Sequence, residues 1–177
     1  MDDSMSGSTR EQFDAAKAEN KELMAQLNAA QSKYMNKAEE RLGVQAALGK
    51  MLRMINATEN YPLIDAAYEI SEKCEADAKA IMDKLDPVQR DGGESKSDKE
   101  KPACQLEDNL MKYRDKNVQI KKDLKNRAAY YEAECKIKQD WEKVMNQVVE
   151  LTKEKAKKDA PLVERVEEAA KAAAVVF

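Results

Sequence analysis

Apolar residues recur at alternating steps of three and four positions through the N-terminal third of the chain. The repeat has no slip between its two ends and passes through Phe13, Ala16, Asn20, Leu23, Leu27, Ala30, Tyr34, Lys37, Arg41, Val44, Leu48, Met51 and Ile55. This spacing is the a/d seam of a coiled coil, along which one stripe of a helix packs against a partner helix. The pattern predicts a helix that binds other helices over about 65 Å.

Local signals place this first long helix at about residues 8–58. Ser8-Thr9-Arg10-Glu11 is a capping box, in which the Ser8 hydroxyl accepts from the Glu11 amide and the Glu11 side chain reaches back. The preceding residues, 1–7, are small and polar, and they predict a flexible tail.

The positions that flank the seam are mostly polar up to Lys33 and include more apolar residues from Ala38 onward. A helix with a broad apolar stripe meets more than one neighbour, so the second half of the first helix should lie inside a bundle. A second helix, 62–85, follows with Pro62 in its first turn and is about half as long. We therefore expect residues 8–85 to form a long helix and a return helix that covers only its second half.

Residues 86–102 lack apolar periodicity. They contain two prolines, a Gly-Gly pair and dense mixed charge, which predict a disordered linker.

Residues 103–177 predict a second long helix, 103–158, and a short C-terminal helix, 160–176, that begins after Asp159. The long helix carries its own seam, through Leu106, Leu110, Tyr113, Asn117, Ile120, Leu124, Arg127, Tyr131, Glu134, Lys138, Trp141, Met145 and Val148. The short helix has apolar residues at heptad spacing. It should either fold back on the bundle or enter a groove of a partner.

Asn20 and Asn117 both fall at a positions, and an offset of 97 places them opposite each other in a parallel pair of helices. A buried asparagine fixes register because a shifted partner leaves its amide unpaired. The same offset pairs Leu23 with Ile120, Leu27 with Leu124, Tyr34 with Tyr131, Lys37 with Glu134, Val44 with Trp141, Leu48 with Met145 and Met51 with Val148. It also sets Ala30 against Arg127 and Arg41 against Lys138. An antiparallel arrangement and a seam used between chains are the alternatives.

The composition agrees with long helices and disfavours a compact globule. Of the 177 residues 37% are charged and 5% are aromatic, and there are five glycines and four prolines. Acidic and basic residues nearly balance, at 34 and 31. Net charge therefore gives no reason to expect nucleic acid or an anionic membrane as the main partner.

The chain contains no histidine, no Gly-rich phosphate loop and no cluster of metal-ligand residues. Histidine-dependent nucleophile activation and general base catalysis are therefore excluded. We expect no enzymatic activity, no cofactor and no metal. The three cysteines, Cys74, Cys104 and Cys135, are widely spaced, and we expect them to be reduced and buried. The N-terminal residues lack an apolar stretch and no apolar run reaches the length of a membrane span, so we expect no signal peptide and an intracellular protein, cytoplasmic or nuclear.

One stretch of the second long helix is locally basic. Seven cationic residues, namely Lys112, Arg114, Lys116, Lys121, Lys122, Lys125 and Arg127, stand against Asp115 and Asp123. Such a face is most often a solvated helix surface, but it also suits acidic tails such as those of tubulin, or nucleic acid phosphates. No aromatic residues interleave to stack bases, which makes nucleic acid unlikely.

In its two heptad helices the chain resembles the small coiled-coil subunits of eukaryotic kinetochore and spindle complexes. No stretch here predicts the compact α/β head in which such subunits often end. The resemblance implies a non-enzymatic structural or adaptor subunit that binds other coiled-coil proteins as a hetero- or homo-oligomer. The alternatives are a subunit of a vesicle- or organelle-associated helical complex, and a direct microtubule or nucleic-acid binder. The expected interaction residues are Phe13, Asn20, Leu23, Leu27, Tyr34, Leu48, Met51, Leu110, Asn117, Ile120, Leu124, Tyr131, Trp141 and Met145.

Overall fold

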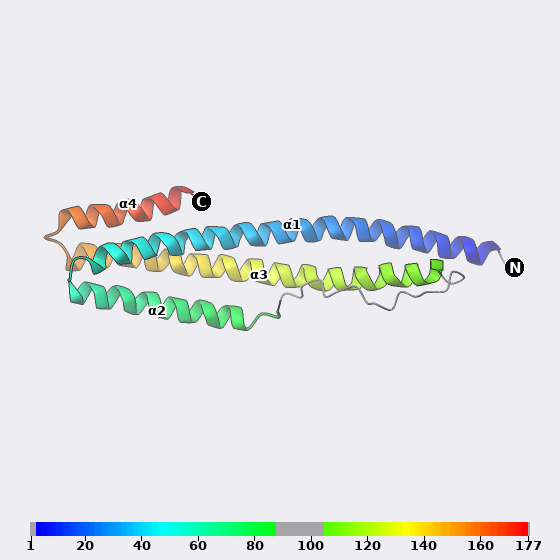
Figure 1. Ribbon diagram of the computed structural model, residues 1–177, viewed down its shortest axis with the longest axis horizontal. Helices are drawn as coiled ribbons and strands as arrows, with labels where there is room; N and C mark the ends of the chain where they lie inside the picture. The colour runs from blue at the N-terminus through cyan, green and yellow to red at the C-terminus, as the bar shows by residue number, and fades with distance from the viewer. Residues whose placement is uncertain (1–2, 88–104, 177) are drawn as a thin grey trace. The chain divides into compact units, whose positions relative to one another are not determined.

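The protein is all-α, as predicted. The computed structural model describes residues 3–87 and 105–176, with side chains for 9–87 and 105–173, and this part contains four helices and no strand. They are α1 (Asp3–Asn56), α2 (Tyr61–Asp83), α3 (Gln105–Lys155) and α4 (Ala160–Val176) (Figure 1). Cys104 and nearly all of the predicted linker, 86–102, lie outside the described residues.

Helix α1 begins five residues earlier than predicted. It starts at Asp3, so Ser8 lies within the helix and is not its N-cap. The capping-box pattern marks a favourable start, but serine and threonine inside a helix cost only a few tenths of a kcal/mol each. The capping-box pattern therefore did not prevent the helix from beginning before Ser8.

The turn between α1 and α2 is closed by short polar contacts. The Thr58 hydroxyl donates to the Ile55 carbonyl at 2.6 Å, and the Asn60 side chain caps α2 by accepting from the Leu63 amide at 3.3 Å. Between them Glu59 has φ of 56°, the left-handed conformation that often ends a helix. Pro62 lies in the first turn of α2, as predicted.

The chain divides into two compact units, and both contain part of α1 and part of α3. The first unit pairs α1 up to Lys33 with α3 up to Ala129; the second unit contains α1 from Tyr34, α2, α3 from Tyr130, and α4.

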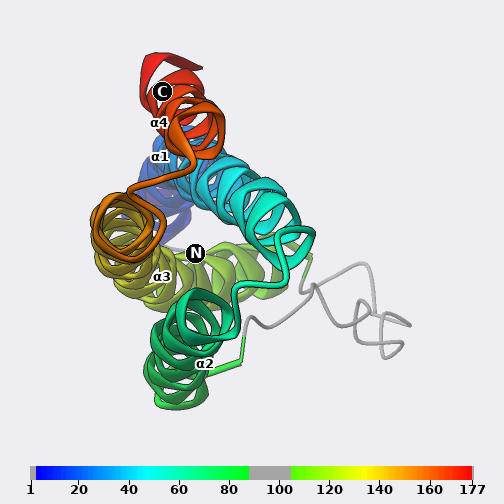
Figure 2. The same cartoon turned by 90° about the vertical axis from the view of Figure 1, so that its left-hand side faces the viewer.

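In the second unit four helices enclose one apolar core. Helices α1 and α3 run in the same direction, and α2 and α4 return along opposite faces of this pair (Figures 1 and 2). All four helices contribute to the largest fully buried apolar side chains, which are Met51, Ile55, Leu63, Val148 and Val166. This core confirms that the second half of α1 lies inside a bundle, and it decides between the two alternatives left open for α4. The flanking residues Ala47, Leu52 and Met54 pack against it, and α4 folds back on the bundle.

Among the described residues, the interior of the first unit is formed by two helices, α1 and α3. Ala16 and Leu23 of α1 are buried, and so are Leu110 and Ile120 of α3. Phe13, Leu27, Tyr113 and Leu124 are only half-buried. In the described part of this unit one side of these seam residues lies near solvent, because the two helices cover only the other side.

Candidate functional site

The asparagines that were predicted to set the register contact each other in the first unit. The Asn20 Nδ2 donates to the Asn117 Oδ1 at 3.0 Å, which confirms the pairing at offset 97. The Asn117 Nδ2 in turn donates to the Ala16 carbonyl at 3.1 Å, and Asn117 is 4% exposed. The buried amide is therefore satisfied by α1 through both its oxygen and its nitrogen.

Contacts beside this pair show that α1 and α3 run parallel in the first unit. Arg114 donates to the Gln12 Oε1 at 3.0 Å, and Lys121 lies 3.0 Å from a carboxylate oxygen of Glu19. The residue numbers rise together in both helices, as they do only in a parallel pair. Phe13 and Tyr113 add an edge-to-face ring contact with centroids 5.6 Å apart.

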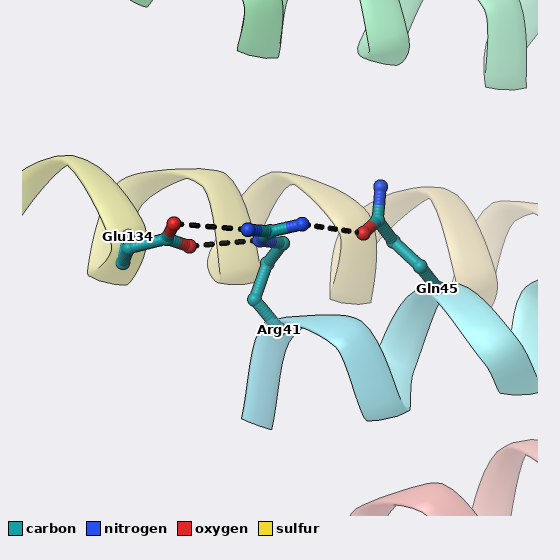
Figure 3. A network of polar contacts seen from close by, with 3 residues as sticks. All are labelled: Arg41, Gln45 and Glu134. Atoms are coloured by element: carbon teal, nitrogen blue, oxygen red, sulfur yellow. Dashed lines mark hydrogen bonds and ion pairs between the residues drawn. The ribbon is translucent and has the colours of Figure 1, made fainter. Parts of the chain in front are cut away.

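In the second unit an ion pair lies at the edge of the apolar core. The Arg41 guanidinium donates to both oxygens of Glu134, at 2.8 and 3.0 Å, and its third nitrogen donates to the Gln45 Oε1 at 2.8 Å (Figure 3). The Glu134 side chain is 1% exposed. The carboxylate raises the pKa of Arg41 from its ordinary value. A bidentate pair of this kind is the arrangement by which a buried carboxylate is best satisfied.

A second charged layer lies beside the first. The Glu40 carboxylate is 2.5 Å from Lys37 and 3.6 Å from Lys138. The pKa of Glu40 is lowered, mainly by its contact with Lys37 and also by Lys138. The pKa of Lys37 is raised for the same reason. Two cations thus share one carboxylate between α1 and α3.

These charged layers differ from the predicted ones. Offset 97 set Lys37 against Glu134 and Arg41 against Lys138. In the structure Arg41 instead forms an ion pair with Glu134. The Glu40 carboxylate lies within ion-pair distance of both Lys37 and Lys138. A side chain on a helix leans toward the N-terminus of that helix, so the long Arg41 reaches a residue one turn earlier in α3. The like-charged layer that the prediction required is thereby avoided. The sequence does contain a signal for this pairing, because Arg41 and Glu134 carry opposite charges and lie one helical turn apart when the two seams are aligned.

Tyr131 is the seam residue that the sequence placed incorrectly. The ring of Tyr34 packs on Tyr130, with centroids 5.4 Å apart, and Tyr131 is half-buried beside it. Ile137, which was also missed, is 3% exposed. From Tyr130 the buried stripe of α3 widens to one side of the predicted seam, while Glu134, Trp141, Met145 and Val148 of that seam stay buried. In this unit α3 has more than one helical neighbour, and the sequence repeat alone assumes a single partner.

The structure divides the other predicted residues into two groups. The buried seam residues are Leu23, Leu48, Met51, Leu110, Asn117, Ile120, Trp141 and Met145, and the half-buried ones are Phe13, Asn20, Leu27, Tyr34 and Leu124. On the basic face, Arg114, Lys116, Lys121, Lys122 and Lys125 are exposed, whereas Lys112 and Arg127 are half-buried. Arg127 donates to Gln31, so it belongs to the helix pair rather than to the outer face.

A shallow groove lies beside the asparagine pair in the first unit. It has a volume of about 570 Å³ and is lined by Asp14, Lys17, Ala18, Asn20, Lys21, Met24 and Tyr113. Met24 is 42% exposed. The groove has no nucleophile paired with a base, so the chemistry that its lining offers is that of binding.

Cys74 is free and buried, as expected, whereas Cys135 is free but only half-buried. Burial raises the pKa of the Cys74 thiol to about 11. Among the described residues no group of His, Cys, Asp or Glu side chains is placed to hold a metal ion. No helix in the described ranges, 3–87 and 105–176, is long and apolar enough to cross a membrane.

Comparison of the chain with protein-family models, with curated proteins and with solved structures finds no match.

Proposed function

We propose that this chain is a non-enzymatic structural or adaptor subunit that joins a larger intracellular assembly by packing helix against helix. The single observation that carries the proposal is the half-buried seam of the first unit, where α1 and α3 are the two helices that the structure describes. Phe13, Leu27 and Leu124 are half-buried there, and Met24 is exposed. Apolar side chains left at the surface of a helix pair are the usual contact residues for another helix.

The assembly that we favour is of the kinetochore or mitotic-spindle type, with the protein in the cytoplasm, the nucleus or both. Its support is the sequence resemblance of the two heptad helices to coiled-coil subunits of such complexes. The experiment is to follow a fluorescent fusion of the full chain through the cell cycle. Enrichment at kinetochores or spindle structures during division is the expected result. An even distribution at all stages, or steady enrichment on an organelle, contradicts this assignment.

A helix-packing subunit also differs from a charge-driven binder in its response to salt. Complexes that form by helix packing should survive purification in high salt, because their contacts are apolar. The second candidate, direct binding of a microtubule or nucleic acid, is favoured by the exposed Lys122 and Lys125 on the basic face. Co-sedimentation with the bare polymer that is lost between low and moderate salt would support this candidate instead.

A further inference from the structure

Two exposed stripes on different helices carry opposite charges. The acidic stripe of α2 consists of Tyr61, Asp65, Tyr68, Glu72 and Glu75, and the basic stripe of α3 consists of Met111, Asp115, Val118, Lys122 and Lys125. Each stripe contains two large apolar side chains that the protein leaves in solvent. Tyr61 and Tyr68 are 67% and 36% exposed, and Met111 and Val118 are 57% and 53% exposed.

The two stripes have the same spacing. Their residues follow one another at steps of four, three, four and three along each helix, so they lie on one side of it. An offset of 50 superimposes them and sets Tyr61 against Met111, Tyr68 against Val118, Glu72 against Lys122, and Glu75 against Lys125. Two apolar layers and two layers of opposite charge therefore coincide when the helices run parallel.

The charge around each stripe has the same sign as the stripe. Helix α2 holds six acidic residues and two lysines, whereas residues 105–129 of α3 hold seven basic and four acidic residues. Electrostatic complementarity of this kind selects a partner and fixes its register.

Within one chain, α2 belongs to a different unit from the part of α3 that carries the basic stripe. The Asn60 Nδ2 donates to the Lys155 carbonyl at 3.1 Å, which holds the start of α2 beside the end of α3. The basic stripe ends at Lys125, before the part of α3, from Tyr130, that shares a unit with α2.

We propose that the chain self-associates, with the acidic stripe of one copy docked in parallel on the basic stripe of a second copy. The partner surface for each stripe is the other stripe of the same sequence, which has the same spacing and the opposite charge. Since each copy carries both stripes, each copy is able to supply either side of the contact. This contact is independent of the assembly proposed above and is testable on the purified chain alone.

One layer of the proposed contact opposes like charges. Asp65 falls at the level of Asp115, and both are exposed. Asp115→Lys should therefore tighten self-association by about threefold to tenfold, since it replaces a repulsive layer by an attractive one. The mirrored charge change on α4, Glu164→Lys, should leave self-association unchanged.

The decisive experiment is sedimentation velocity over a concentration series with two charge-reversed variants. One variant reverses the acidic stripe by Glu72→Lys and Glu75→Lys; the other reverses the basic stripe by Lys122→Glu and Lys125→Glu. The wild-type chain should form dimers in roughly the micromolar range, as small interfaces do. Each variant alone should dimerise about tenfold to a hundredfold more weakly, because its two copies oppose like charges.

Mixing the two variants should restore dimers of wild-type strength, since every altered pair then meets its opposite. A mixture that stays monomeric overturns the proposal, and so do variants that each dimerise like the wild type. A wild-type chain that is monomeric up to about 1 mM overturns it as well. Circular dichroism melting of each variant verifies that its helices are intact, and Glu164→Lys with Glu168→Lys on α4 serves as the matched control.

Discussion

Arg41 and Glu134 form the most deeply buried ion pair of the second unit, and they join α1 to α3 at the edge of its apolar core. Breaking such a pair leaves a charge without a partner, whereas replacing both members by apolar residues is often neutral. We expect Arg41→Met to lower the free energy of unfolding by about 3–5 kcal/mol, because Glu134 is then unpaired. The double variant with Glu134→Leu should recover most of this loss in urea unfolding.

An exposed pair supplies the control for this measurement. Lys136 lies 2.9 Å from Asp140 and its side chain is 58% exposed. Lys136→Met should change stability by less than about 1 kcal/mol. If Arg41→Met costs no more than this control, the buried pair does not contribute to the fold as described.

The asparagine contact predicts coupling between two residues 97 positions apart. Asn20→Leu removes the donor to the Asn117 Oδ1, and a buried polar group without a partner costs about 1–3 kcal/mol. A double-mutant cycle with Asn117→Leu should give a coupling energy of about 0.5–3 kcal/mol. The same cycle between Asn20 and Asn126 should be additive within about 0.5 kcal/mol, because Asn126 lies two and a half turns away from Asn117. Equal coupling in both cycles would refute a specific amide pair.

The left-handed Glu59 should respond to glycine. Glycine adopts positive φ without steric cost, and the gain is partly offset by its greater freedom in the unfolded chain. We expect Glu59→Gly to stabilise the protein by up to about 1 kcal/mol in thermal unfolding. Glu59→Ala keeps the steric cost and should change little, and Glu59→Val should destabilise. A loss of stability with glycine would show that the Glu59 side chain itself supports the turn.

The buried thiol of Cys74 should react slowly with alkylating reagents. Its pKa is raised to about 11 from 9.0, so the thiolate is scarce near pH 8.5. Iodoacetamide should modify Cys135 before Cys74 in the folded protein, as read by peptide mass spectrometry, and both at similar rates in guanidinium chloride. Equal rates in the folded protein would contradict the burial of Cys74.

The same shift makes stability depend on pH. A pKa that is higher in the folded state means that the folded chain binds the proton more tightly. The stabilisation is complete below about pH 9 and is lost as the pH rises toward 11. Cys74→Ala should flatten this part of the stability profile.

Sequence reasoning found the register of the first unit because a single polar residue in each seam restricts how two helices align. Asn20 and Asn117 leave one alignment that satisfies both amides. The predicted contact of Tyr131 was wrong, because a repeat along one helix does not show how many other helices surround that helix. Ile137 lies beside the predicted seam and is buried in the core that four helices form. The prediction of the charged layers was wrong for another reason. It paired Arg41 with Lys138 because their backbones lie at the same level along the helix axis, and it did not consider how far the long Arg41 side chain extends.

The parallel pairing of α1 and α3 has a consequence for how the protein is made. Its contacts join residues about a hundred positions apart, as between Gln12 and Arg114, which gives the fold a high contact order for a helical protein. At a synthesis rate of about 5–20 residues per second, the seam of α1 leaves the ribosome roughly 5–20 seconds before its partner in α3 exists. Throughout that interval the nascent α1 presents an unpaired apolar stripe, which the α3 of a neighbouring finished chain, or a chaperone, is able to bind first.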